Sequence, residues 1–253
     1  MEFLPPDMDM LATSLLVVIS FAGAFITAAM GIGGGVIMIA FMATLMPAAA
    51  VIPVHGVVQV GANVTRAVIQ RVHIDWKTSA YFILGSVVGV SIGGSIVVTL
   101  PTGILRAGLG LFILYTVWGP KLKFVAEGYF TVSLIGLVAS FLTMFFGATG
   151  VFIAGLLNQR GYGPQQFIGT HAICMGAQHT LKIIVFGFLG FAFADWLGVI
   201  VMMLAGGLVG TLLGSLVLNR LPREIFAKGL KLILTLLALN LLAMAAGIYS
   251  LTP

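Results

Sequence analysis

Long apolar runs, interrupted by short stretches rich in glycine or polar residues, limit most strongly how this chain can fold. Hydrophobic residues make up 60% of the chain and charged residues only 8%. Soluble domains carry about 25% charged residues, so a chain this poor in charge cannot cover a surface that faces water. The runs lack the alternation of polar and apolar residues that a membrane barrel requires. The sequence therefore predicts an all-α integral membrane protein.

Two of the apolar segments are too short to cross a bilayer, which needs about 20 residues. Each is preceded by a glycine-containing break, which begins at Gly31 in one case and at Gly147 in the other. The breaks predict helices that stop, turn and restart within the membrane, at Val36 and Val151. The apolar segments cover about 10–30, 34–46, 53–71, 77–99, 102–119, 125–146, 150–158, 165–190, 195–218 and 228–250, the short ones being 34–46 and 150–158.

Polar side chains inside the apolar runs form two matching stripes. The first stripe is His55, Gln59, Asn63 and Arg66, and the second is His171, Gln178, His179 and Lys182. The two leading histidines are 116 positions apart, and so are the two cations that close the stripes. Histidine and cation are eleven residues apart in each stripe, close to a whole number of helical turns, so they share one helix face.

The same spacing recurs elsewhere and predicts a duplicated unit of about 115–120 residues. Gly31 pairs with Gly147 and Gly34 with Gly150 at 116 positions, and glycine ridges at 85, 89 and 93 recur 121 positions later at 206, 210 and 214. Such ridges suit close helix packing, within the protein or at the face of a homodimer. The predicted organisation is an extramembrane leader at 1–9, a first repeat at 10–119, a basic linker at 120–124 and a second repeat at 125–253.

The distribution of basic residues predicts that the two repeats are inverted. The net charge is +5, from 12 Lys and Arg against 7 Asp and Glu, and basic loops of one half match nearly neutral loops of the other. Basic loops stay on the cytoplasmic side, so the halves should have opposite orientations. Each repeat then comprises a broken or re-entrant helical hairpin plus three transmembrane helices, with both termini on the outer side of the bacterial inner membrane. The basic residues that show this asymmetry are Arg66, Arg71, Lys77, Lys121, Lys123, Arg160, Arg220, Arg223, Lys228 and Lys231; of the other two, Arg106 follows the nearly neutral loop 99–105 and Lys182 lies inside an apolar run.

The charged residues that lie inside the apolar runs favour an anionic substrate. All seven acidic residues lie near segment ends, whereas carriers of cations commonly place Asp or Glu at depth. Arg66 and Lys182 remain as cations inside the runs, although Arg66 lies close enough to Arg71 to reach the membrane interface instead. The basic excess does not indicate a nucleic-acid partner, because no basic stripe with interleaved aromatic residues is present. The expected partners are a small anion and membrane lipid.

The glycine breaks and the stripes together form the candidate substrate site. A helix that restarts exposes unpaired N–H groups and a positive dipole end, which bind anions. The side-chain amides of Gln59, Asn63 and Gln178 can donate hydrogen bonds to an oxyanion or can join helices. His55 and His171 can hydrogen-bond a neighbouring backbone group or act as a proton-sensitive gate. Neither cofactor nor metal is expected, since the histidines lack nearby carboxylates and the chain has one cysteine, Cys174. The candidates are Gly33, Gly34, Gly35, Thr149 and Gly150 of the breaks, with both polar stripes.

The motif Gly31-Ile32-Gly33-Gly34-Gly35, which opens a short helix after the first span, carries a resemblance to a known family. In this motif, and in length, repeat and glycine placement, the chain resembles the TauE/SafE sulfite exporter family, also described as toluene sulfonate uptake permeases. The resemblance implies a secondary carrier for sulfite, sulfonates or related organosulfur or carboxylate anions. Ala40 stands where the family pattern often has proline, and the second break, 147–150, lacks a triple glycine.

Composition, repeat and resemblance together predict an anion transporter, and not an enzyme, that works by alternating access. Its coupling ion would be H⁺ or Na⁺. Two alternatives stay open: an intramembrane enzyme with a metal held by histidines, and a scaffold subunit whose polar stripes only join helices. The identity of the anion, the direction of transport and the oligomeric state are left open by the sequence.

Overall fold

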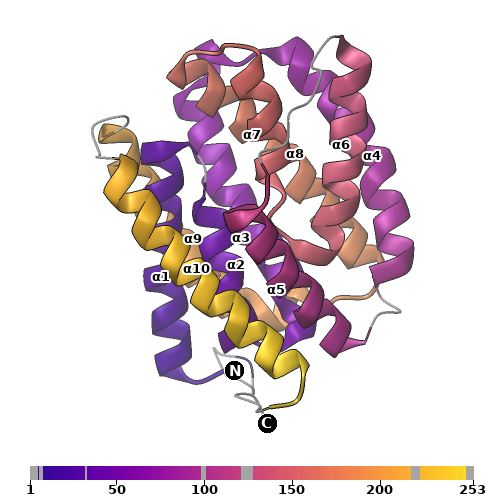
Figure 1. The fold of residues 1–253 in the computed structure, drawn as a ribbon, viewed down its shortest axis with the longest axis vertical. Helices are drawn as coiled ribbons and strands as arrows, with labels where there is room; N and C mark the ends of the chain where they lie inside the picture. The colour runs from indigo at the N-terminus through magenta and orange to yellow at the C-terminus, as the bar shows by residue number, and fades with distance from the viewer. Residues whose placement is uncertain are drawn as a thin grey trace.

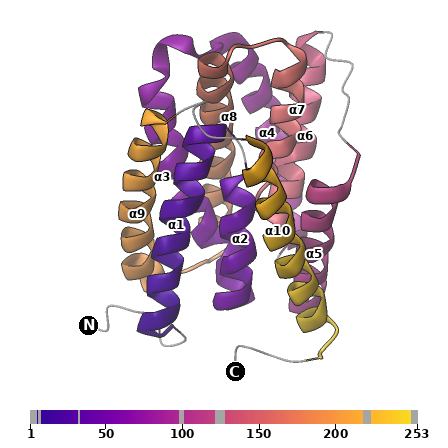
Figure 2. The same cartoon turned by 60° about the vertical axis from the view of Figure 1, so that its left-hand side comes forward.

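The protein, described here from a computed structural model, is built entirely from helices within the described residues (Figures 1 and 2). The structure describes residues 5, 8–31, 33–97, 101–120, 128–217 and 223–248, with side chains of the last range described from 228 onward. Six helices in these ranges are long and apolar enough to cross a membrane: Met10–Met30, Ala48–Ile69, Trp76–Val97, Tyr129–Phe146, Phe193–Leu216 and Lys228–Ala245. The prediction of an all-α, multi-pass membrane protein is thereby confirmed.

The helix boundaries repeat with the spacing seen in the sequence. Helices α1 and α6 end at Met30 and Phe146, and α3 and α8 begin at Ala48 and Pro164, 116 positions apart in both cases. The elements are α1 (Met10–Met30), α2 (Gly34–Leu45), α3 (Ala48–Ile69), η1 (Arg71–His73), α4 (Trp76–Val97), α5 (Thr102–Trp118), α6 (Tyr129–Phe146), α7 (Gly150–Gln159), α8 (Pro164–Phe188), η2 (Phe193–Trp196), α9 (Leu197–Leu216) and α10 (Arg223–Ala245).

Several boundaries differ from those expected; α10, for example, begins at Arg223 and ends at Ala245, five residues before the expected 228 and 250. The short helices begin at Gly34 and Gly150, and not at Val36 and Val151, because the turn is completed by glycines that precede the helix. Helix α3 begins at Ala48, five residues early, with Pro53 inside it. Three successive alanines, which favour helix, add a turn before the proline. Residues 1–4 and 6–7 of the predicted leader, and 121–124 of the linker, lie outside the described residues.

The glycine ridges pack inside the protein, each against a helix of the other half. A Cβ added to Gly85 of α4 would lie 1.8 Å from the carbonyl oxygen of Ser133 in α6. A Cβ on Gly210 of α9 would lie 2.2 Å from the carbonyl oxygen of Phe21 in α1. Helix pairs this close require glycine at the contact. The sequence left open an internal or a dimeric role for the ridges, and the structure shows the internal one.

Helices α3 and α8 lie antiparallel at the centre of the molecule. A Cβ added to Gly56, in the first half of α3, would lie 2.9 Å from Cε of Lys182 in the second half of α8. At the other end of the pair, a Cβ on Gly169 would lie 3.1 Å from Gln70. Each stripe therefore begins where the other one ends. The short helices α2 and α7 start alongside this pair, with Gly35 against Gln59 of α3 and Gly150 against His171 of α8.

The loops α3–α4 and α7–α8 meet at one end of the molecule, which we call the basic end because Arg71, Lys77 and Arg160 lie there. The Tyr162 hydroxyl donates a hydrogen bond to the carboxylate of Asp75, and the backbone N–H of Asp75 donates to Thr170 Oγ1 at 2.9 Å. The start of α1 and the end of α10 both lie at the opposite end of the molecule (Figure 2).

Asp75 accepts several of the hydrogen bonds in the polar network at the basic end. Its carboxylate accepts hydrogen bonds from the backbone N–H of Thr78 at 3.0 Å and from the Thr78 hydroxyl at 2.8 Å, besides that from Tyr162. Burial raises the pKa of Asp75, but the hydrogen bonds from Tyr162 and Thr78 outweigh it and leave the pKa below its ordinary value of 3.8. The ionised form of Asp75 therefore holds the two loops together.

Candidate functional site

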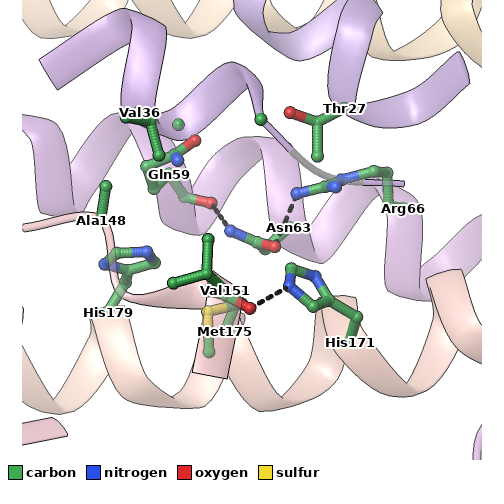
Figure 3. Close-up of a pocket in the computed structure, with 13 residues that line it drawn as sticks. Thr27, Val36, Gln59, Asn63, Arg66, Ala148, Val151, His171, Met175 and His179 are labelled. Atoms are coloured by element: carbon green, nitrogen blue, oxygen red, sulfur yellow. Dashed lines mark hydrogen bonds between the residues drawn. The ribbon is translucent and has the colours of Figure 1, made fainter. Parts of the chain in front are cut away.

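The polar stripes of α3 and α8 meet at a small cavity between the two glycine breaks (Figure 3). Its volume is about 40 Å³. A single water needs about 10–15 Å³ on this measure, so the cavity holds a few water-sized groups. The lining residues are Thr27, Gly33, Gly35, Val36, Gln59, Asn63, Arg66, Ala148, Gly150, Val151, His171, Met175 and His179.

Eight of the thirteen predicted site residues line this cavity. They are Gly33, Gly35, Gln59, Asn63, Arg66, Gly150, His171 and His179. The five that do not line it are Gly34, His55, Thr149, Gln178 and Lys182. The lining also includes residues that were not predicted as site residues. Of these, Met175 lies 116 positions after Gln59, so the repeat could have identified it. Val36 and Val151 were predicted only as the starts of the short helices, and Ala148 carries no polar signal.

Arg66 is the only cation that lines the cavity among the described residues. Its side chain is 3% exposed, so it does not extend to the membrane interface as the alternative interpretation required. Nη2 donates to Asn63 Oδ1 at 2.7 Å and Nε donates to the Ala62 carbonyl at 3.3 Å. Nη1 has no hydrogen-bond partner within the described part of the chain. The guanidinium thus keeps its charge and one N–H₂ group available in a buried site.

His171 lies beside Arg66 and is bound to the start of α7. Its Nε2 lies 3.2 Å from the carbonyl oxygen of Gly150, and its Nδ1 is buried with no partner in the described residues. A carbonyl can only accept, so Nε2 carries the proton and Nδ1 of the neutral ring is an acceptor. The backbone bond that was one of the two interpretations of this histidine is present. It leaves the second ring nitrogen free to take up a proton.

Both short helices start at the wall of the cavity. Gly33 caps α2 with φ of 105°, a left-handed conformation that glycine adopts most easily. The Gly34 N–H is bound by Thr27 Oγ1 at 3.0 Å. A Cβ on Gly35 would lie 2.3 Å from Gln59 Nε2, so glycine is needed there for Gln59 to reach the wall. The positive ends of α2 and α7, which starts at Gly150, therefore point to a shared space.

Thr149 and Gln178 lie behind the cavity and join helices. Thr149 Oγ1 donates to the Ala139 carbonyl at 2.9 Å and lies 3.3 Å from Gln178 Oε1. Gln178 Nε2 donates to Ser140 Oγ at 2.9 Å. These bonds fasten α8 to α6 and to the second break. For Gln178 the structure therefore shows the helix-joining interpretation.

His55 and Lys182 form a second buried cluster, separate from the cavity lining. His55 Nε2 lies 3.1 Å from the Gly35 carbonyl, and Lys182 Nζ donates to the Gly147 carbonyl at 3.4 Å. The His55 ring stands edge-on to that of His179, with centroids 5.6 Å apart. In the described part of the chain, no three His, Cys, Asp or Glu side chains gather as a metal site would require.

Comparison with known families agrees with this architecture. The model of the family described as sulfite exporter TauE/SafE matches residues 15–241, which is most of the 253-residue chain. Comparisons with curated proteins and with solved structures gave no significant match. The matched region includes both glycine breaks, both polar stripes and the cavity between them. The chain therefore belongs to the TauE/SafE sulfite exporter family of membrane transporters.

Proposed function

We propose that the protein is a secondary transporter that carries a small sulfur oxyanion, such as sulfite or a small sulfonate, across the bacterial inner membrane by alternating access. The observation that carries this proposal is the Arg66 guanidinium, buried at the cavity with Nη1 unpartnered among the described residues. A buried cation without a counterion is costly in a membrane protein and marks a site for an anion.

The surroundings of Arg66 support an oxyanion over a cation. The acidic side chains that the structure describes are Asp9, Asp75 and Asp195, and each lies at the start of a helix, away from the cavity. The starts of α2 and α7 add positive dipole ends, and the Gln59 amide adds a hydrogen-bond donor. A volume of about 40 Å³ favours a small anion of a few heavy atoms over a bulky sulfonate.

The helix arrangement supports alternating access by two inverted repeats. Helix α3 lies antiparallel to its counterpart α8, and the start of α5 lies beside the end of its counterpart α10, where a Cβ on Gly103 would be 3.8 Å from the Ala245 carbonyl oxygen. Inverted repeats with interrupted helices at a central site are common in secondary transporters. The positive-inside rule then assigns the basic end to the cytoplasm and both termini to the outer side.

His171 supplies a route to proton coupling. With Nε2–H bonded to Gly150, the neutral ring offers only an acceptor at Nδ1, whereas the imidazolium offers a donor there. An anion and a proton would then bind together, next to the Arg66 charge. Sodium coupling has less support, because the described acidic side chains do not line the cavity.

Uptake into proteoliposomes tests the proposal. We expect saturable flux of at least one of sulfite, thiosulfate, taurine, sulfoacetate and small carboxylates, with the smaller sulfur oxyanions preferred. A pH jump and a sodium jump in the same assay identify the coupling ion, and we expect the pH jump to drive flux. Folded protein that neither binds nor transports any of these anions would contradict the proposal.

A further inference from the structure

Lys182 is a buried cation that does not line the cavity at Arg66. It is fully buried, and its one described hydrogen bond is the long contact of 3.4 Å to the Gly147 carbonyl. Lys182 occupies the position in its repeat that Arg66 occupies in the other, 116 residues earlier. We propose that Lys182 and His55 form a second oxyanion site on the transport path, closed in this conformation, to which the anion passes from Arg66. This proposal rests on the proposed function.

The two cations are too far apart to share one small anion. Lys182 Cε lies against Gly56 of α3, and Arg66 follows ten residues later on the same helix. The Arg66 guanidinium reaches back along α3 to the Ala62 carbonyl and Asn63 Oδ1, six to seven residues after Gly56, so about 9–10 Å of helix separates the two charged groups. Because α3 and α8 are antiparallel, equal positions in the two stripes fall at opposite ends of the central helix pair. One oxyanion can therefore contact Arg66 or Lys182, but not both at once.

A single side chain closes the second site. A Cβ added to Gly147 would lie 2.0 Å from Ile39 Cδ1 and 3.6 Å from His55 Nδ1, so Ile39 fills the space beside the Lys182 contact. The residue 116 positions after Ile39 is Gly155, and the matching space beside Gly31 is occupied from α8, where a Cβ added to Gly31 would lie 3.1 Å from Phe167 and 3.7 Å from Ile168. Ile39 is thus the side chain that stands beside His55 and the Lys182 contact at the second site.

A larger recess lies just beyond Lys182. It has a volume of about 300 Å³ and is lined by Ile52 of α3 and Phe186 of α8, among others. Ile52 precedes His55 by three residues and Phe186 follows Lys182 by four, about one helical turn in each case. Lys182 and His55 thus lie between the cavity at Arg66 and a recess near the end opposite the basic loops. A second oxyanion site on a transport path across the molecule would lie at this position.

The variant Lys182→Met separates the two sites. Sulfite binding to purified protein, measured by calorimetry under anaerobic conditions, should keep a Kd within about threefold of wild type, because the Arg66 cavity is intact. Sulfite flux into proteoliposomes should fall about tenfold or more, because the second oxyanion site has lost the Lys182 charge. Lys182→Arg should restore part of the flux, and Lys228→Met, at an exposed cation of α10, should leave binding and flux unchanged.

Two results with Lys182→Met would overturn the second site. Loss of sulfite binding equal to that in Arg66→Gln would show one shared site, and wild-type flux would show that Lys182 is not on the path. The variant Ile39→Ala gives an independent test that keeps both cations: we expect a flux change of about twofold or more with an unchanged Kd, and wild-type flux would contradict the closing role of Ile39. If wild-type protein neither binds nor transports sulfite or the other anions, the proposed function itself fails.

Discussion

At the scale of single residues, Asn63 decides how the charge of Arg66 is presented. Its Oδ1 accepts from Arg66 Nη2 at 2.7 Å, and its Nδ2 donates to the Gln59 carbonyl at 2.7 Å. The amide therefore orients the guanidinium without neutralising it. A carboxylate of the same shape would orient it and neutralise it, which makes Asn63 a sensitive position for testing the role of charge.

We expect Asn63→Asp to remove oxyanion binding while leaving the protein folded. The new carboxylate would pair with the guanidinium through a charge-assisted hydrogen bond and repel the anion, weakening sulfite binding about tenfold or more. Calorimetry with sulfite measures the change, and Asn158→Asp, which adds the same charge at an exposed position of α7, serves as the control. Unchanged binding in Asn63→Asp would argue against Arg66 as the anion site.

Asp75 gives a prediction about stability and pH. Its pKa is lowered in the folded protein, so the ionised carboxylate stabilises the fold above its ordinary value of 3.8, and this contribution is lost as the pH falls through that range. Asp75→Asn should lower stability at pH 7 by about 1–3 kcal/mol and flatten the pH dependence below 4. Thermal unfolding in detergent from pH 3 to 7 measures both effects.

Asp195, the counterpart of Asp75 in the second half, provides the matched control. It lies exposed in η2, and no hydrogen bond of its side chain is described. Asp195→Asn should therefore leave the melting temperature and its pH dependence close to those of wild type. An equal loss in both variants would mean that general charge, and not the loop network at the basic end, sets the stability.

At the scale of elements, the glycine ridges determine how closely α1 approaches α9 and α4 approaches α6. Gly210→Ala should destabilise the protein by about 1–3 kcal/mol, because the new Cβ would lie 2.2 Å from backbone of α1 that cannot move aside easily. Gly229→Ala, in α10, is the control: nothing lies within 4 Å of its added Cβ, and alanine favours the helix. Thermal unfolding in detergent that ranks the two variants equally would contradict the packing role.

Sequence patterns predicted the helices better than they predicted which residues of neighbouring helices lie at the same level along the helix axes. The short helices α2 and α7 were predictable because glycine breaks and length are local signals, whereas the early start of α3 depends on three alanines that precede a proline. Helical periodicity shows which residues share a face, but the relative height of two stripes is set by tertiary packing. That is why eight predicted residues were brought together while Lys182 and His55 lie elsewhere.

At the scale of the whole molecule, the proposed inverted repeats place both ends of the chain on the outer side of the membrane. The start of α1 and the end of α10 lie at the same end, away from the basic loops (Figure 2). A C-terminal alkaline phosphatase fusion should be active, and a fusion to green fluorescent protein at the same point should be dark. The reverse pattern would contradict the orientation while leaving the cavity unaffected.

The account as a whole depends on Arg66 as the anion-binding charge of a transporter. The most direct measurement is sulfite uptake into proteoliposomes by wild type, Arg66→Gln and Arg71→Gln, the last being an exposed arginine at the basic end. We predict saturable uptake by wild type and Arg71→Gln, and a loss of about tenfold or more in Arg66→Gln, because a buried guanidinium–anion pair is lost. Uptake by Arg66→Gln equal to that of wild type would contradict the central claim.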